Sequence, residues 1–114
     1  MKENQILNYA KVEQFYNKNQ FIIKTNNSII FQSYNSIICI LTDGEKNPVF
    51  GNDWDYSKTT IKHLYLFLYY YLKSYNCDYE LKMKIMGILA NSKNKKADLQ
   101  KLINNGEIIL DENI

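Results

Sequence analysis

The sequence predicts a single α+β domain, residues 1–114, in which an antiparallel β-meander of three to four strands precedes a buried helix and one or two shorter helices. Three observations predict this class. The length of 114 residues suits one domain. Apolar runs separated by turn residues fill residues 20–50, and apolar residues at helical spacing fill residues 57–105. Hydrophobic residues make up 46% and charged residues 23%, which excludes a wholly disordered chain.

The first seventeen residues predict a short N-terminal helix. Apolar side chains recur loosely at helical spacing between Ile6 and Tyr16. No basic stretch followed by an apolar stretch is present, so we expect no export signal. The longest apolar run, 64–72, has nine residues, whereas a membrane span needs ~20. We therefore expect a cytoplasmic protein with no membrane partner.

The meander is predicted over residues 20–50, where β-branched and aromatic residues alternate with turn residues. Asp43-Gly44 is a strong hairpin signal. Pro48 lacks a backbone donor, so the run after it is expected at a strand start or sheet edge. The strands are expected at four apolar runs: 21–23, 29–31, 37–41 and 49–50.

The helical part is predicted over residues 57–105, with Ser57 as the N-cap of its first helix. That helix is apolar almost all round, which predicts the central buried element. A second helix begins after Asp78, and a third ends near Gly106, a typical C-cap residue. Residues 107–110 predict a final strand.

The composition offers little for catalysis or metal binding. The chain has one His and two Cys without a Cys-x-x-Cys pair, so no structural zinc site can be assembled on the usual spacings. No glycine-rich phosphate loop is present. We expect no cofactor, no resident metal and no catalytic set, and we lean towards a protein that is not an enzyme.

Two short motifs stand out, Ser-Tyr-Asn-Ser-Ile-Ile at residues 33–38 and Tyr-Ser-Lys-Thr-Thr-Ile-Lys-His at residues 56–63. Together they resemble a family of small uncharacterised bacteriophage and prophage proteins with a Ser-Tyr-Asn-Thr-like segment and a Tyr-Ser-x-Thr-Thr-x-Lys-His motif. The resemblance covers roughly residues 30–70. Ser36 departs from the commoner Thr, and Cys39 from the commoner small Ala. The resemblance implies a phage setting, hence the host cytoplasm, and no established reaction.

The second motif has two interpretations. Hydroxyls and lysines at a helix N-terminus form an anion site, because the helix dipole places positive charge there. The same residues also cap the helix and lock the strand-to-helix junction. On the first interpretation the candidate binding residues are Tyr34, Asn35, Tyr56, Ser57, Lys58, Thr59, Thr60, Lys62 and His63.

Charge is unevenly distributed along the chain. Residues 57–105 hold nine Lys and three acids, net +6, although the whole chain carries only +2. AT-rich codons encode Lys, Tyr, Asn, Ile and Phe, so their abundance alone does not indicate a nucleic-acid partner. All basic residues are Lys; without Arg, bidentate reading of guanine is weak and we expect little sequence preference.

These observations favour a phage or mobile-element accessory protein that acts by stoichiometric binding. The partner is nucleic acid, or a host protein or ribonucleoprotein complex that handles it, including the inhibition of a defence system such as CRISPR. For a host protein, the better candidates are acids that mimic phosphates: Asp43, Glu45, Asp53 and Asp55.

Two alternatives remain open. One is a small metal-dependent nuclease that uses Asp53, Asp55 and His63. The other is a structural homodimer. Tyrosines at 69, 70 and 71 spread over ~200° of a helix, so they cannot all face one core. We therefore expect Tyr69 and Tyr70 at an interface, with a second copy or another partner.

Overall fold

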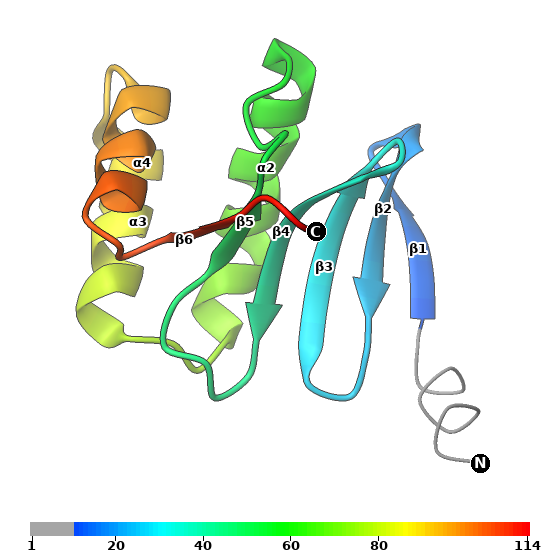
Figure 1. The fold of residues 1–114 in the computed structure, drawn as a ribbon, viewed down its shortest axis with the longest axis horizontal. Helices are drawn as coiled ribbons and strands as arrows, with labels where there is room; N and C mark the ends of the chain where they lie inside the picture. The colour runs from blue at the N-terminus through cyan, green and yellow to red at the C-terminus, as the bar shows by residue number, and fades with distance from the viewer. Residues whose placement is uncertain (1–10) are drawn as a thin grey trace.

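The computed structural model describes residues 11–114 and confirms the α+β class (Figure 1). Five strands precede the helices: β1 (Lys11–Phe15), β2 (Asn17–Lys24), β3 (Ser28–Ser33), β4 (Ser36–Thr42) and β5 (Val49–Gly51). The helices are α2 (Lys58–Tyr71), a 3-10 turn η1 (Leu72–Ser74), α3 (Tyr79–Asn91) and α4 (Lys95–Asn104). A last strand, β6 (Ile109–Asp111), follows.

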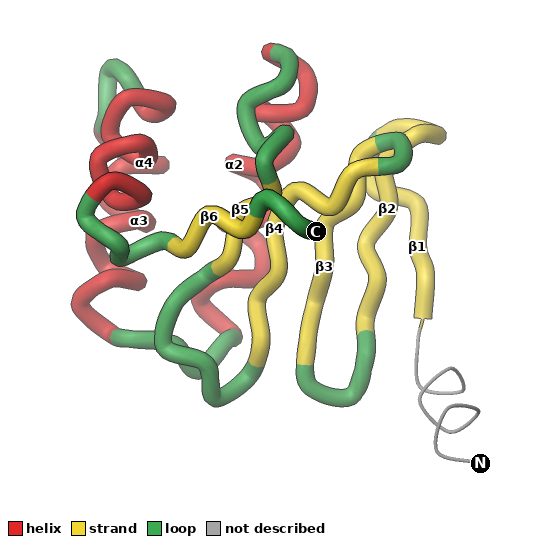
Figure 2. Tube along the Cα trace, viewed as in Figure 1, coloured by secondary structure: helices red, strands yellow, loops and turns green. Residues whose placement is uncertain are grey.

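The sheet has six strands in the order β1-β2-β3-β4-β5-β6, more than the three to four predicted. The first five strands pair antiparallel, and β6 pairs parallel to β5. The β1–β2 and β3–β4 connections lie at one end of the sheet, and the β2–β3 and β4–β5 connections at the other (Figure 2).

The helix predicted for the first seventeen residues is wrong for residues 11–15, which form β1; its first ten residues lie outside the described part of the chain. The segment Lys-Val-Glu-Gln-Phe pairs with β2, and only Phe15 is buried. Tyr16 makes the tight turn into β2 with a left-handed φ of 66°. Pairing with an edge of the sheet therefore outweighs the loose helical spacing of this segment.

The final strand is present as β6, which begins two residues later than predicted. β5 starts directly after Pro48, as predicted. The amide of Ile109 donates to the carbonyl of Pro48 at 3.0 Å, and β6 pairs with β5, so β5 lies inside the sheet and not at its edge. Gly51 ends β5 where a Cβ would lie 1.9 Å from the carbonyl oxygen of Ile37. Only glycine allows this close approach of the two strands.

The core lies between the sheet and α2, the buried helix that the sequence predicts. Phe31 on β3 stacks on Phe67 of α2 at 5.7 Å between ring centroids. Leu64 and Leu68 on the same helix face have no exposed surface. The helices α3 and α4 form a hairpin at the β6 end of the sheet (Figure 1). No helix in residues 11–114 is long and apolar enough to span a membrane.

Candidate functional site

The β3–β4 turn and the start of α2 enclose a pocket of about 520 Å³, which we call the turn–helix pocket. The two sequence motifs therefore meet in space, although about twenty residues separate them in the chain. A volume of this size is ordinary for a small-molecule site. The pocket is lined by Ser33, Tyr34, Asn35, Ser36, Ile38, Asp53, Tyr56, Ser57 and Thr60.

Ser33 faces this pocket by the regular alternation of β3, in which Ile29, Phe31 and Ser33 are buried, and a β-bulge in β4 brings Ser36 to the same side. The register of β3 with β4 shifts between Phe31 and Gln32, so the consecutive residues Ile38 and Cys39 are both buried. Ser33 then pairs with Ser36 across the turn. Residues paired in this way share a face of the sheet, and here both serines line the pocket.

Tyr34 occupies the turn itself with a left-handed φ of 53°. A non-glycine residue in this region costs about 1–3 kcal/mol. Two hydrogen bonds hold the turn: the Tyr34 amide donates to the Asn19 carbonyl at 2.7 Å, and Gln32 Nε2 donates to the Tyr34 carbonyl at 2.7 Å. The Tyr34 side chain stays 65% exposed, and Tyr56 at the other motif stays 76% exposed. Each motif thus contributes one accessible aromatic ring to the pocket.

Ser57 caps α2 as predicted. Its Oγ accepts the amide of Thr60 at 3.0 Å and donates to Thr60 Oγ1 at 3.0 Å. The amides of Lys58 and Thr59 have no acceptor inside a helix at these positions. The first turn of α2 contains no acidic residue, so no side chain of the helix itself opposes the positive end of its dipole.

An unpaired polar group lies in the pocket wall. Ser33 is 4% exposed, and its Oγ has no hydrogen-bond partner among residues 11–114. A buried hydroxyl without a partner costs about 1–3 kcal/mol. Gln20, its cross-strand neighbour, likewise has an unpaired Oε1. A polar ligand in the pocket would give the Ser33 hydroxyl a partner.

Asp53 supplies the negative charge of the pocket. Its Oδ2 accepts a hydrogen bond from Ser36 Oγ at 2.8 Å. A carboxylate has about four lone-pair sites, so it can accept further donors from a ligand. Asp55 is directed elsewhere, since its Oδ2 lies 3.6 Å from Lys96 Nζ.

His63 does not line the pocket, unlike the other end of its motif. It lies one turn after Thr60, with its ring stacked on Tyr16 at 5.5 Å and edge-on to Phe15 at 6.3 Å. Its Nδ1 is buried without a hydrogen-bond partner in the described chain. Burial and, next, the charge of Lys62 lower the pKa of His63 below its usual value of 6.5, and the Thr59 backbone opposes part of this shift.

Lys58, Thr59 and Lys62 also lie outside the pocket, exposed on the solvent side of α2. The lysines share that side with Tyr69 and Tyr70, since at ~100° per residue the four positions fall within about 120° of arc. The two tyrosines are 50% and 49% exposed, with ring centroids 5.4 Å apart. We call this surface the lysine–tyrosine face: Lys58, Lys62, Tyr69, Tyr70 and Lys73.

The lysine–tyrosine face contains no negative charge of its own, because no acidic residue occurs between Lys58 and Ser74. Lys73 Nζ lies 5.6 Å from the centroid of the Tyr69 ring, a cation–π contact. Tyr16 of the β1–β2 turn stacks on His63 of α2 at 5.5 Å between ring centroids, so this turn adjoins the helix, and the neighbouring Tyr70 raises the pKa of Tyr16.

The residues named for nuclease chemistry are not brought together. Within residues 11–114, no group of three or more His, Cys, Asp and Glu residues is placed to hold a metal ion. Cys39 is fully buried, and burial raises the pKa of its thiol well above the usual value, which makes it a poor nucleophile.

The sequence does not predict that Ser33, Ser36 and Asp53 line the pocket. It also does not predict the turn at Tyr16, which lies next to the start of α2. Ser33 and Ser36 flank the predicted turn; Ser33 faces inward by the alternation of β3, and the inward position of Ser36 depends on a bulge that has no local sequence signal. Asp53 is expected as a metal ligand or as a phosphate mimic, but not as part of the pocket formed by the two motifs. Tyr16 falls in the predicted helix because it continues the helical spacing of apolar residues, and a tyrosine, not a glycine, holds the left-handed position of its turn.

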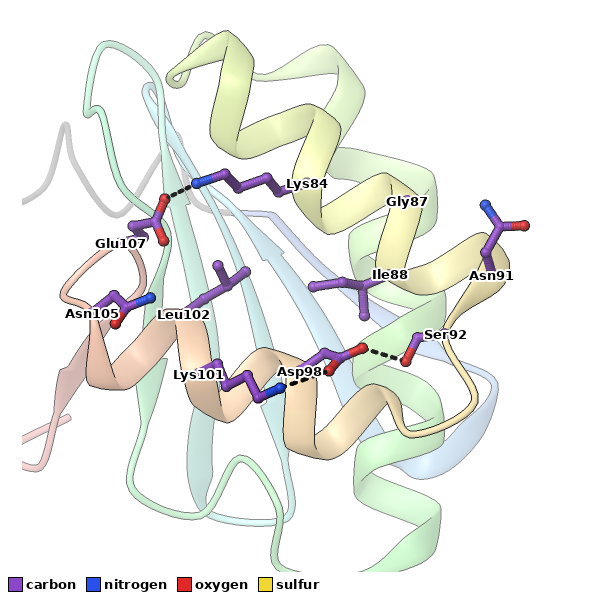
Figure 3. A pocket seen from close by; sticks show the side chains of 10 residues that line it. All are labelled: Lys84, Gly87, Ile88, Asn91, Ser92, Asp98, Lys101, Leu102, Asn105 and Glu107. Carbon is purple, nitrogen blue, oxygen red and sulfur yellow. Dashed lines mark hydrogen bonds and ion pairs between the residues drawn. The ribbon is translucent and has the colours of Figure 1, made fainter.

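A second cavity, of about 570 Å³, lies between α3 and α4 (Figure 3). Its charged side chains pair mainly with one another. Lys84 Nζ lies 2.6 Å from Glu107 Oε1, and Ser92 Oγ donates to Asp98 Oδ2 at 2.6 Å. Because these groups already have partners, this cavity is a weaker candidate for ligand binding than the turn–helix pocket.

The chain belongs to a family of unknown function, DUF8033, whose model matches residues 1–82. No curated protein and no solved structure matches the chain. The matched residues contain the turn–helix pocket and the lysine–tyrosine face. The cavity between α3 and α4 lies beyond the match, since its lining begins at Lys84.

Proposed function

We propose that this protein binds single-stranded nucleic acid stoichiometrically, through the lysine–tyrosine face and the adjoining turn–helix pocket. One observation carries the proposal: the exposed side of α2 combines lysines and accessible tyrosine rings with no acidic residue from Lys58 to Ser74. Proteins that bind single strands combine positive charge along the backbone with aromatic rings on which bases stack.

Each part of the surface has a distinct task. Lys58, Lys62 and Lys73 neutralise phosphates, and the free amides at the start of α2 donate hydrogen bonds to one phosphate. Tyr69 and Tyr70 provide rings for stacking, a contact worth about 1–3 kcal/mol per base. Stacking requires unpaired bases, which favours a single strand over a duplex.

The placement of the acids favours nucleic acid over a basic host protein. Asp43 and Glu45 follow the far end of β4, whereas Asp53 is bonded to Ser36 at the near end. β4 has seven residues, and at ~3.3 Å per residue it separates the two groups by roughly 20 Å. Asp55 lies beside Lys96, with Oδ2 3.6 Å from Nζ. These four acids therefore form no continuous row of negative charge that could replace the phosphates of a nucleic acid.

For the biological setting, we propose a phage or mobile-element accessory protein that hinders a host defence complex by occupying its nucleic acid. The support is the resemblance of residues 33–38 and 56–63 to small phage proteins. A surface that binds strands through charge and stacking, with no metal cluster in residues 11–114, suits masking better than cleavage.

The exposure of Tyr69 and Tyr70 also supports a second candidate, a homodimer that buries these rings between two copies. Light scattering across a range of protein concentrations separates the two candidates. A constant monomer mass excludes the homodimer, and a mass that doubles with concentration supports it.

A fluorescence anisotropy titration tests nucleic-acid binding directly. Labelled single-stranded DNA and RNA of mixed sequence, and the matching duplex, are titrated with the full chain at several salt concentrations. We expect saturable binding to the single strands at 1:1 stoichiometry, weaker binding to the duplex, and a log–log salt slope of ~0.7 per phosphate contact. No binding at low salt would overturn the proposal and leave a host protein as the target.

A further inference from the structure

The turn–helix pocket has features that the lysine–tyrosine face lacks. Its hydroxyls and carboxylate mostly accept or share hydrogen bonds, and it contains no lysine side chain. The buried Ser33 Oγ has no partner in the described chain, and Asp53 retains acceptor capacity beside its bond from Ser36. Two accessible rings, Tyr34 and Tyr56, belong to its lining. An aromatic ligand with N–H donors on its edge fits this chemistry.

On the basis of the proposed function, we propose that this pocket receives one unstacked base of the bound strand and prefers guanine. Guanine is the base whose Watson–Crick edge presents two adjacent N–H donors, N1–H and the N2 amino group. Both can be accepted by one carboxylate, and Asp53 is the carboxylate that lines the pocket. The ring of the base stacks against Tyr34 or Tyr56, as exposed bases do in single-strand recognition.

The other bases satisfy Asp53 less well. Adenine and cytosine each place an amino donor beside a ring acceptor, so only one hydrogen bond to the carboxylate is available. Thymine and uracil place carbonyl oxygens on both sides of their single donor, and these oxygens face the negative charge. The expected order is guanine first, adenine and cytosine intermediate, and thymine or uracil last.

The position of Ser57 connects the pocket to the rest of the strand. Ser57 lines the pocket and also caps α2, so the pocket opens beside the amides of Lys58 and Thr59. A base in the pocket therefore brings its own phosphate to the helix N-terminus, where positive dipole and free amides coincide. From there the nucleic-acid strand continues along the lysine–tyrosine face. The absence of Arg predicts little sequence preference, and this pocket would add a preference for one base.

Competition binding with short thymidine oligonucleotides, in which only one central base is varied, tests this inference. We expect the single guanine to bind about fivefold or more tightly than thymine, the range of a bidentate base contact. The variant Asp53→Asn should lose this preference while it still binds the all-thymidine strand. Asp55→Asn removes the same charge outside the pocket and should retain the preference.

A second variant keeps the test independent of folding. Ser33→Ala removes a buried hydroxyl that has no partner in the described chain, so its melting temperature should stay equal to the parent's or rise. Its affinity for the guanine-containing strand should nevertheless fall, because the Ser33 hydroxyl is proposed as a partner of the bound base. Equal affinity for all four bases, or a preference that survives in Asp53→Asn, would overturn the inference and leave the proposed function intact. Binding to none of the oligonucleotides would overturn both.

Discussion

The starts of the three helices share one capping scheme but differ in charge. Ser57, Asp78 and Asn94 each accept the amide three residues on, at 3.0, 3.0 and 3.2 Å. In α3 the cap is itself an acid and Glu80 follows in the first turn; in α4 the first turn contains Asp98. The first turn of α2 has no acid. The dipoles of α3 and α4 are thus met by carboxylates of their own first turns, whereas the acids nearest the start of α2, Asp53 and Asp55, precede the helix.

This difference separates the task of stability from that of binding. An acid in the first turn stabilises a helix by about 0.3–1 kcal/mol, and α2 does without it. Burial holds α2 in place instead. Five of its residues are buried: Thr60, His63, Leu64, Phe67 and Leu68. Because these buried residues hold α2 against the sheet, the helix needs no acidic residue in its first turn or on its exposed side.

The largest effect is expected from the buried side of α2. Leu64→Ala or Leu68→Ala should lower the free energy of unfolding by about 2–5 kcal/mol, because each removes a fully buried side chain from the core. Met83→Ala on α3 is the control, since that side chain is 46% exposed and should change stability by about 0.5 kcal/mol or less. Chemical denaturation measures both. Equal small effects would show that α2 is not held by burial.

The next effect concerns binding. Lys58→Glu with Lys62→Glu should weaken single-strand binding by about tenfold or more and lower the salt slope by ~0.7 per lysine. Lys93→Glu with Lys101→Glu makes the same change in net charge on the α3–α4 hairpin and should have a much smaller effect. Anisotropy at fixed salt compares the two double variants. If both weaken binding equally, the whole charge of the chain matters and not the face of α2.

The same comparison shows what the sequence could predict. The cap at Ser57 and the buried face of α2 follow from local residue types and helical spacing, and both are confirmed. β1 was missed because it is an edge strand with one buried residue, so burial imposes no clear alternation on it. Its turn depends on Tyr16 in a left-handed conformation, for which the sequence has no signal.

The pocket was predictable only in part. The two motifs were identified, and they do meet, but their meeting depends on strand pairing over long distances in the chain. The inward placement of Ser36 depends on the bulge at Ile38, whereas that of Ser33 follows the alternation of β3. His63 does not line the pocket because its ring packs against Phe15 and Tyr16. Both residues lie in the segment for which the sequence predicts a helix. Errors at the edge of the sheet thus became errors in the site.

A smaller effect comes from making α2 resemble α3. Ser57→Asp retains a capping oxygen and adds a negative charge at the helix start. It should raise stability by about 0.3–1 kcal/mol and weaken single-strand binding by about twofold to fivefold, because the charge opposes a phosphate at the same place. Ser57→Asn caps without charge and is the control. A variant that binds as tightly as the parent would show that no phosphate lies at this helix start.

The smallest effect is expected from His63, the one histidine of the chain. Burial and the charge of Lys62 lower its pKa in the folded protein, so between the two pKa values the unfolded chain binds a proton that the folded chain does not. Stability then rises with pH. The contribution of His63 to stability is complete above the pKa of histidine in the unfolded chain, about 6.5, and is lost as the pH falls below that value. Melting temperatures between pH 7.5 and 5.5 measure this loss.

His63→Phe provides the comparison, since a phenyl ring can keep the contacts with Phe15 and Tyr16 but cannot take up a proton. The variant should lose less stability than the parent over the same pH range. Carboxylates titrate mostly below this range and act on both proteins alike. Parallel pH profiles would mean that the imidazole is as easily protonated in the folded chain as in the unfolded one. The buried side of α2 would then carry a charge below pH 6.5, and its separation from the charged, exposed side would hold only near neutral pH.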